Sequence, residues 1–156
     1  MLFLNLFIIF VLGTIIGSFL NVVVLRYNTG LSIISGRSRC FSCGKDLCWY
    51  ELIPIFSFLF LRGKCLGCNS KISCQYPIVE FLTGIIFVGL FLKFGLTQLL
   101  PLYFFIAFLL IAMSIYDFKH KIIPDGMVFT FIIFSFGILL STHTLGELFG
   151  LPISLD

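Results

Sequence analysis

The sequence predicts an all-α polytopic membrane protein in which a small cysteine-rich insertion interrupts about four transmembrane helices. Three observations lead to this fold class. Hydrophobic residues make up 60% of the chain and charged residues only 11%, with a mean hydropathy of +1.16, which a water-soluble globule does not sustain. Uncharged apolar stretches recur along the chain. Two Cys-x-x-Cys pairs lie in the polar stretch that follows the first of them.

The first transmembrane helix is predicted over Leu2–Leu25, which carries no charge. At 1.5 Å per residue this stretch exceeds the hydrocarbon core, which is about 30 Å thick. A cleaved signal peptide is the alternative, but no basic residue follows Met1 and no small-residue cleavage site precedes Arg26. Further spans are predicted at Ile78–Leu92, Leu99–Tyr116 and Met127–Leu140.

The basic residues indicate the orientation in the membrane, because Lys and Arg concentrate in cytoplasmic loops. Only Lys93 lies in the turn between the second and third spans, and every other lysine and arginine falls on the opposite face. We therefore expect the insertion to be cytosolic and Met1 to be outside. The net charge of +3 gives no reason to expect nucleic acid, and the basic face suits anionic lipid headgroups.

The candidate metal ligands are four cysteines, Cys40, Cys43, Cys65 and Cys68. The two pairs are separated by 21 residues, a spacing that brings four thiolates to one tetrahedral point in structural zinc sites. A reducing cytosol disfavours disulfides, so we expect a metal thiolate site, with an unmetallated loop as the alternative. Four ligands complete such a site, and Cys48 and Cys74 are left without a metal role.

Small and polar residues interrupt the apolar spans at a few positions. Gly13 and Gly17 form a Gly-x-x-x-Gly pair that either lets another helix approach closely or is incidental. Asn21 needs hydrogen-bond partners for both ends of its amide. Glu80, near the start of the second span, is either an end charge that reaches the interface or a functional carboxylate inside the bundle, where it costs about 2.5–3.5 kcal/mol.

Asp117 is the candidate catalytic residue. It lies at the cytosolic end of the third span, and a carboxylic acid there suits general acid–base work on a peptide bond. The alternative is a helix-end carboxylate paired with Lys121, four residues further on. Asp125 follows Pro124 at the start of the fourth span, where it is placed to cap the helix; the proline-broken turn does not favour a carboxylate pair with Asp117. The chain has no Ser-His-Asp arrangement, phosphate-binding loop or dinucleotide motif.

Several motifs occur together in the order of a known family. They are Gly17–Val23 with Arg26, the two cysteine pairs, Leu61–Cys65, Lys71–Ser73, Tyr76–Glu80, and Asp117 with Ile123–Asp125. In this order they resemble the bacterial prepilin peptidases, or type IV leader peptidases, of the aspartic-peptidase A24 family. The resemblance extends from about Gly13 to Met127.

The resemblance implies a multi-pass enzyme of the bacterial inner membrane. Such an enzyme cleaves the basic leader of type IV pilins or type II secretion pseudopilins at the cytosolic face. It then N-methylates the new amino terminus with S-adenosylmethionine. The implied partners are a prepilin or pseudoprepilin and the lipid bilayer.

The family's functional positions carry over to this chain residue by residue. Asp117 matches the first catalytic aspartate, and the four paired cysteines match a zinc-type domain with a structural zinc. Gly63, Lys64 and Glu80 match positions associated with that domain and its neighbouring helix; together with Asp125 they are our candidates for substrate- or methylation-associated residues. The predicted division is residues 1–25 as first helix, 26–76 as zinc-type domain, and 77–156 as the helical portion with Asp117.

The chain departs from the family's pattern in two respects. Phe41 replaces the proline that is common after the first cysteine, which should loosen that loop without removing a ligand. The family's second aspartate lies in a Gly-x-Gly-Asp motif on a later helix, and nothing after Asp117 has that form. We therefore expect the chain to stop before the second catalytic motif. The alternatives are a non-catalytic scaffold that binds prepilin or an assembly partner, and methyl transfer without cleavage. The sequence leaves open the particular prepilin, the oligomeric state, the source of the second aspartate and the natural length.

Overall fold

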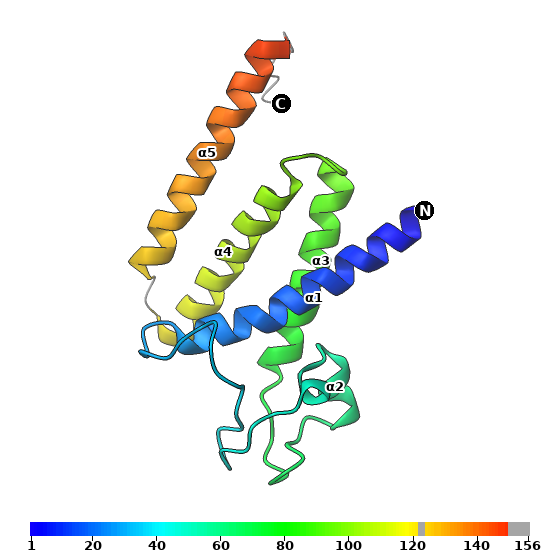
Figure 1. The fold of residues 1–156 in the computed structure, drawn as a ribbon, viewed down its shortest axis with the longest axis vertical. Coiled ribbons are helices and arrows are strands. Elements are labelled where there is room, and N and C mark those ends of the chain that lie inside the picture. The colour runs from blue at the N-terminus through cyan, green and yellow to red at the C-terminus, as the bar shows by residue number, and fades with distance from the viewer. Residues whose placement is uncertain (122–123, 150–156) are drawn as a thin grey trace. The chain divides into compact units, whose positions relative to one another are not determined.

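The computed structural model describes residues 1–121 and 124–149, with side chains as far as residue 137. The chain divides into two compact units after Gly95. The regular elements are α1 (Leu2–Arg26), the 3₁₀ helix η1 (Trp49–Leu52), α2 (Phe56–Phe60), α3 (Gln75–Phe94), α4 (Leu100–His120) and α5 (Asp125–Phe149) (Figure 1). The prediction of an all-α fold is confirmed.

Three of the predicted membrane spans are confirmed. Helices α1, α3 and α4 are each long and apolar enough to cross a membrane. The second span begins three residues earlier than predicted, at Gln75, because Pro77 is accommodated in the first helical turn. The fourth predicted span falls on α5, whose apolar portion with described side chains is the shorter stretch Asp125–Gly137. A fourth crossing remains a prediction.

Helices α1 and α3 pack backbone to backbone at the glycines of α1. A Cβ atom at Gly13 would lie 2.7 Å from the Cα atom of Gly84, and a Cβ atom at Gly17 would lie 2.7 Å from the Cα atom of Glu80. No side chain larger than hydrogen fits at either position, which confirms that the Gly-x-x-x-Gly pair serves close helix approach. The side chains of Leu20, Val24, Thr83 and Phe87 fill the core of this contact.

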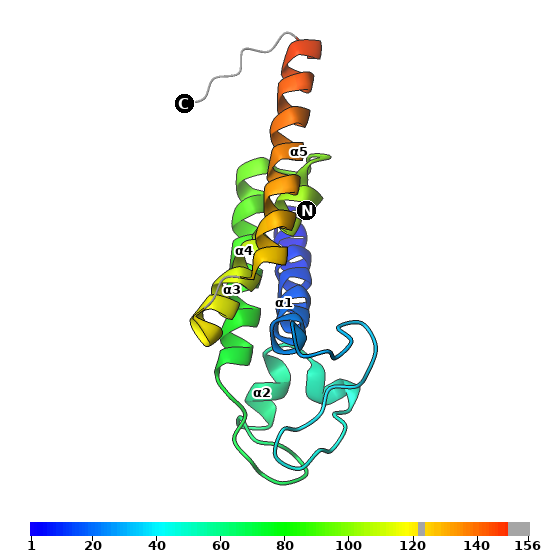
Figure 2. The ribbon, with the colours of Figure 1, turned by 90° about the vertical axis from the view of Figure 1, so that its left-hand side faces the viewer.

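The cysteine-rich insertion joins the end of α1 to the start of α3 and lies beyond those two helix ends in both views (Figures 1 and 2). Arg26, the last residue of α1, organises the first part of the insertion. Its guanidinium donates hydrogen bonds to the carbonyl oxygens of Ser32 (2.7 Å), Ser35 (3.1 Å) and Arg37 (3.1 Å). These hydrogen bonds to the Arg26 guanidinium hold the irregular loop that follows α1 in place.

The second unit contains α4 and α5, which contact each other through rings such as Phe105 and Phe134, whose centroids are 4.5 Å apart. Helix α4 ends at His120 because Lys121 adopts a left-handed conformation with φ of 56°. The Lys121 N–H donates to the carbonyl oxygen of Asp117 at 2.6 Å. Asp117 therefore lies in the last turn of α4, as predicted.

Candidate functional site

Each Cys-x-x-Cys pair lies in a tight loop closed by the same two backbone hydrogen bonds. The N–H groups of Cys40, Gly44, Cys65 and Asn69 donate to the carbonyl oxygens of Lys45, Cys40, Ser70 and Cys65 respectively, all at 2.9 Å. The residue after each second cysteine has a positive φ, 71° at Gly44 and 55° at Asn69, which only glycine and asparagine adopt readily. The two loops are therefore equivalent, and each presents two thiols in the same way.

The four predicted ligands come together in one cluster. The Sγ atoms of Cys40, Cys43, Cys65 and Cys68 all lie within 4.8 Å of one another. The Sγ atoms of Cys40 and Cys68 are 3.8 Å apart, and a tetrahedron with zinc–sulfur bonds of about 2.3 Å has edges of about 3.8 Å. Cys48 and Cys74 lie outside the cluster, as expected. The thiols fit a four-coordinate metal ion.

The thiols of the cluster differ in acidity. The backbone N–H of Cys43, followed by that of Ser42, lowers the pKa of the Cys40 thiol to about 6. At Cys43 the backbone N–H of Lys45 acts in the same direction, but the neighbouring Cys68 thiol and burial outweigh it and raise the pKa to about 11. Four adjacent thiols therefore do not all ionise by themselves, and a divalent cation removes the repulsion between the thiolates.

Glu51 lies beneath the first cysteine loop, and sequence reasoning did not identify it. Its side chain is 2% exposed and accepts hydrogen bonds from the Cys48 N–H at 2.8 Å and from the Lys45 ammonium at 3.3 Å. The Cys48 N–H first, and then Lys45, lower the pKa of the Glu51 carboxyl. The sequence signal was available, since Glu51 stands three residues after Cys48, the spacing of a capping box.

The insertion is expected to lose stability in acid through Glu51. Folding lowers the pKa of the Glu51 carboxyl below its ordinary value of 4.5, so the ionised carboxylate stabilises the folded insertion above that pH. This stabilisation is lost as the pH falls through the pKa of Glu51 in the folded protein. The measurement is the unfolding temperature of wild type and Glu51→Gln as the pH is lowered. The thiolates protonate in both proteins, so a steeper decline in wild type isolates Glu51, and parallel curves would contradict this role.

Gly63 and Lys64 lie in the turn that follows α2. Gly63 has a φ of 66°, and a Cβ atom there would lie 2.9 Å from Cζ of Phe58. Its carbonyl oxygen accepts the N–H of Ile72 at 2.7 Å, which anchors the second cysteine loop. The Lys64 side chain is exposed. Gly63 is therefore required by backbone geometry, whereas the Lys64 ammonium is available to a ligand.

A cavity of about 700 Å³ lies where α1, α3 and the insertion meet. Its lining includes Asn21, Arg26, Tyr76 and Glu80. Asn21 donates from Nδ2 to the carbonyl oxygens of Gly17 (3.3 Å) and Tyr76 (3.4 Å), so the predicted bond across the helix contact is confirmed. Its Oδ1 atom is buried and has no hydrogen-bond partner. Asn21 thus lines the cavity and carries a buried acceptor without a partner among the described protein groups.

Glu80 is buried at 7% exposure, so the interpretation as an end charge reaching the interface is wrong. Its Oε2 atom accepts the N–H of Ile55 at 2.7 Å. Ile55 is the centre of a γ-turn with φ of 63° and ψ of −52°, closed by the Phe56 N–H and the carbonyl oxygen of Pro54 at 2.6 Å. A β-branched residue is strained in this region. Glu80 thus holds a strained turn of the insertion against α3.

Asp117 and Asp125 belong to the second unit, and both are exposed. Within residues 1–121 and 124–137, the ion pairs join Arg39 to Asp46 and Lys45 to Glu51. The alternative of an Asp117–Lys121 ion pair is therefore not found. Asp125 is the first residue of α5, where a negative charge is favourable at the helix amino terminus. Among the described residues, no ion pair engages the Asp117 carboxylate.

Comparison with known proteins gives a consistent result. Residues 11–94 match the family described as Bacterial Peptidase A24 N-terminal domain. Similar proteins carry the name Prepilin leader peptidase/N-methyltransferase. One from Myxococcus xanthus is 46% identical over 76% of this chain and 36% of its own length. One from Bacillus subtilis is 40% identical over 81% of this chain and 51% of its own length. One from Pseudomonas aeruginosa is 32% identical over 93% of this chain and 55% of its own length. The chain thus spans between about a third and about half of these relatives' length. No solved structure matches.

Proposed function

The chain belongs to the bacterial A24 peptidase family through its N-terminal domain, and on that premise we propose that it processes prepilins. The proposed reaction removes the basic leader of a type IV prepilin or a type II secretion pseudoprepilin and then methylates the new amino terminus. The observation that carries the proposal is the presence in one chain of the family match, the four-thiol cluster and an exposed carboxylate at the end of α4.

Asp117 is proposed to act in leader cleavage. Hydrolysis by aspartates needs two carboxyl groups that share a proton, one as base toward water and the other as acid toward the scissile carbonyl. Asp117 supplies one of them from the end of a membrane helix. The other comes from a Gly-x-Gly-Asp motif in the family pattern, which these 156 residues do not contain. Cleavage is therefore expected when that motif is supplied.

Methyl transfer is proposed to use the cavity between α1, α3 and the insertion. S-adenosylmethionine supplies the methyl group when bound. Glu80 and the unpartnered Oδ1 of Asn21 are acceptors for an ammonium group, either that of the peptide or that of the methyl donor. Lys64, exposed next to the second cysteine loop, is available to an anionic group. Asp125 stays a candidate for substrate binding.

The metal is proposed to be zinc with a structural role, because four thiolates close the coordination shell and leave no position for substrate. The cysteine-rich insertion and the end of α4 are proposed to face the cytosol from the bacterial inner membrane. The distribution of Lys and Arg supports this orientation. The three-part division at residues 25 and 76 is kept as part of the proposal.

Glu80 distinguishes the two activities. In the test, the chain is co-expressed with a prepilin and with a membrane segment carrying Gly-x-Gly-Asp, in cells that lack their own leader peptidase. Mass spectrometry of the pilin amino terminus reports leader removal and methylation together. Wild type is expected to perform both. Glu80→Gln still accepts the Ile55 N–H but lacks the charge, so it is expected to cleave and to lose most of its methylation.

The matched variant is Glu80→Ala, which also releases the Ile55 turn and is expected to impair both reactions. Full methylation by Glu80→Gln would show that the carboxylate only holds the turn. If wild type cleaves nothing even with the added segment, the peptidase proposal is wrong and the scaffold interpretation replaces it.

A further inference from the structure

The insertion exposes large apolar side chains that follow one another along η1, the next turn and α2. The set consists of Trp49, Tyr50, Leu52, Ile53, Phe56, Leu59 and Phe60, here called the aromatic face. Trp49 is 78% exposed and Phe60 is 84% exposed. Soluble surfaces rarely leave so many large apolar side chains together in water, and such a surface marks an interaction site.

The fold fixes the level of the aromatic face relative to α3. Helix α3 has 20 residues and is therefore about 30 Å long, which equals the thickness of the hydrocarbon core. Glu80 lies five residues into α3, or about 7.5 Å along its axis. Its bond to the Ile55 N–H at 2.7 Å holds the start of α2 at that depth. The aromatic face is thus level with the outer part of the acyl chains, just below the headgroups, which is the depth that interfacial segments reach.

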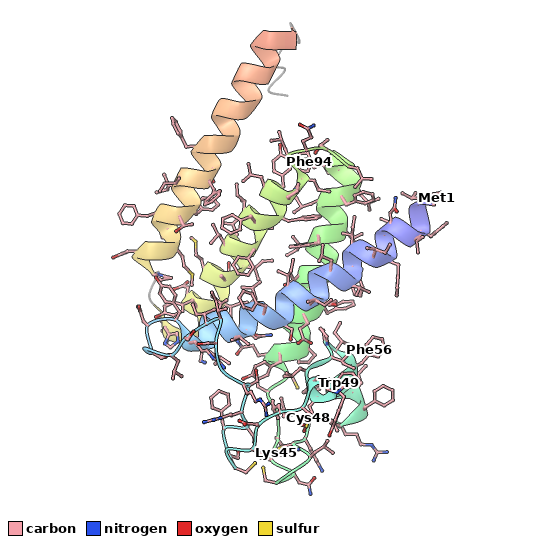
Figure 3. All side chains as sticks on the ribbon, viewed as in Figure 1. Met1, Lys45, Cys48, Trp49, Phe56 and Phe94 are labelled. Carbon is pink, nitrogen blue, oxygen red and sulfur yellow. The ribbon has the colours of Figure 1, made fainter. Side chains whose placement is uncertain are left out.

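The side chains themselves suit that region. Trp and Tyr are enriched at membrane interfaces because each ring has an apolar body and a polar end. The stretch Leu52–Leu61 carries no charge, and the exposed Arg62 and Lys64 follow it directly. In Figure 3, Phe56 lies at the edge of the insertion nearest the membrane helices, Trp49 lies next to it, and Lys45 lies further away. A segment of apolar and aromatic side chains that is followed in the sequence by basic residues is typical of the membrane interface.

We propose that the aromatic face is embedded in the lipid interface of the bilayer that α1 and α3 cross. The insertion then rests on the membrane through η1 and α2, with the cysteine cluster on the water side. Lipid is the occupant because the bond to Glu80 holds the start of α2 beside the membrane helix α3, and because the face consists of exposed apolar and aromatic side chains. This proposal does not depend on the peptidase or methylation activity.

Trp49 is the only tryptophan in the chain and reports its own surroundings. The purified chain is reconstituted into vesicles of phosphatidylcholine and phosphatidylglycerol, with or without bromine on the acyl chains close to the headgroup. We expect brominated lipid to quench the fluorescence of Trp49, and aqueous iodide to have little effect. The emission maximum is expected to be blue-shifted relative to free tryptophan in water.

The matched control moves the reporter within the same domain. The double variant Trp49→Phe/Phe41→Trp places the only indole on the first cysteine loop, where Phe41 is 83% exposed. Its fluorescence is expected to respond to iodide and not to brominated lipid, and its metal content verifies the fold. Equal iodide quenching at the two positions would overturn the proposal. Protection of Trp49 from both quenchers would also overturn it, because the occupant would then be protein.

Discussion

Asp117→Asn is expected to abolish leader removal while membrane insertion and metal content stay unchanged. The carboxylate is exposed and makes no ion pair within the described residues, so the amide of nearly equal shape leaves α4 intact. An amide neither accepts the proton of a water nucleophile nor shares a proton with a second carboxylate. Loss of general acid–base catalysis costs about 10²–10⁴-fold in rate. The measurement is the fraction of prepilin processed with time, in cells that also supply the Gly-x-Gly-Asp segment.

The control variant for Asp117 is Lys121→Gln. If Asp117 were only a helix-end charge balanced by Lys121, the two substitutions would have similar and small effects. We expect Lys121→Gln to cleave normally. Leader removal at the wild-type rate by Asp117→Asn would show that another group performs the chemistry.

Cys40→Ser combined with Cys65→Ser is expected to remove the metal and unfold the insertion. These residues contribute one ligand from each loop, and a two-thiolate remnant does not hold a structural zinc ion. Zinc binding in such sites is worth about 10–16 kcal/mol of apparent free energy and is coupled to folding. Elemental analysis of the purified wild type is expected to give about one zinc per chain, and the double variant almost none.

The cysteines outside the cluster provide the matched control. Cys48→Ser combined with Cys74→Ser removes two thiols as well, and we expect the zinc content to be retained. In wild type, alkylation is expected to reach the exposed Cys74 rapidly and the four clustered thiols only after a chelator is added. Rapid alkylation of all six thiols in metal-replete wild type would refute the metal site.

The membrane helices and the cysteine cluster were predictable because each depends on a local pattern. The span over Leu2–Leu25 differs from α1 by one residue, since a run without charge marks both ends of a helix. The two cysteine pairs were grouped correctly because the Cys-x-x-Cys spacing fixes the geometry of each loop.

The features that were missed depend on contacts between distant residues. The bond from Ile55 to Glu80 spans 25 positions and joins an irregular turn to a membrane helix. No periodicity or spacing encodes it, and a positive φ at isoleucine runs against local preference. The buried acceptor of Asn21 was foreseen as a residue in need of partners, but the cavity around it arises only when α1, α3 and the insertion are assembled. The catalytic assignment of Asp117 stays a prediction.

Two successive contacts connect Gly17 of α1, Glu80 of α3 and Ile55 in the turn that precedes α2. The α1 backbone at Gly17 contacts the backbone of Glu80, and the Glu80 carboxylate accepts a hydrogen bond from the Ile55 N–H. Both contacts are close. At Gly17 the backbones of α1 and α3 lie against each other without an intervening side chain, and the hydrogen bond between Ile55 and Glu80 is 2.7 Å long. The packing of α1 on α3 at Gly17 and the position of the Ile55 turn are therefore joined through a single residue, Glu80.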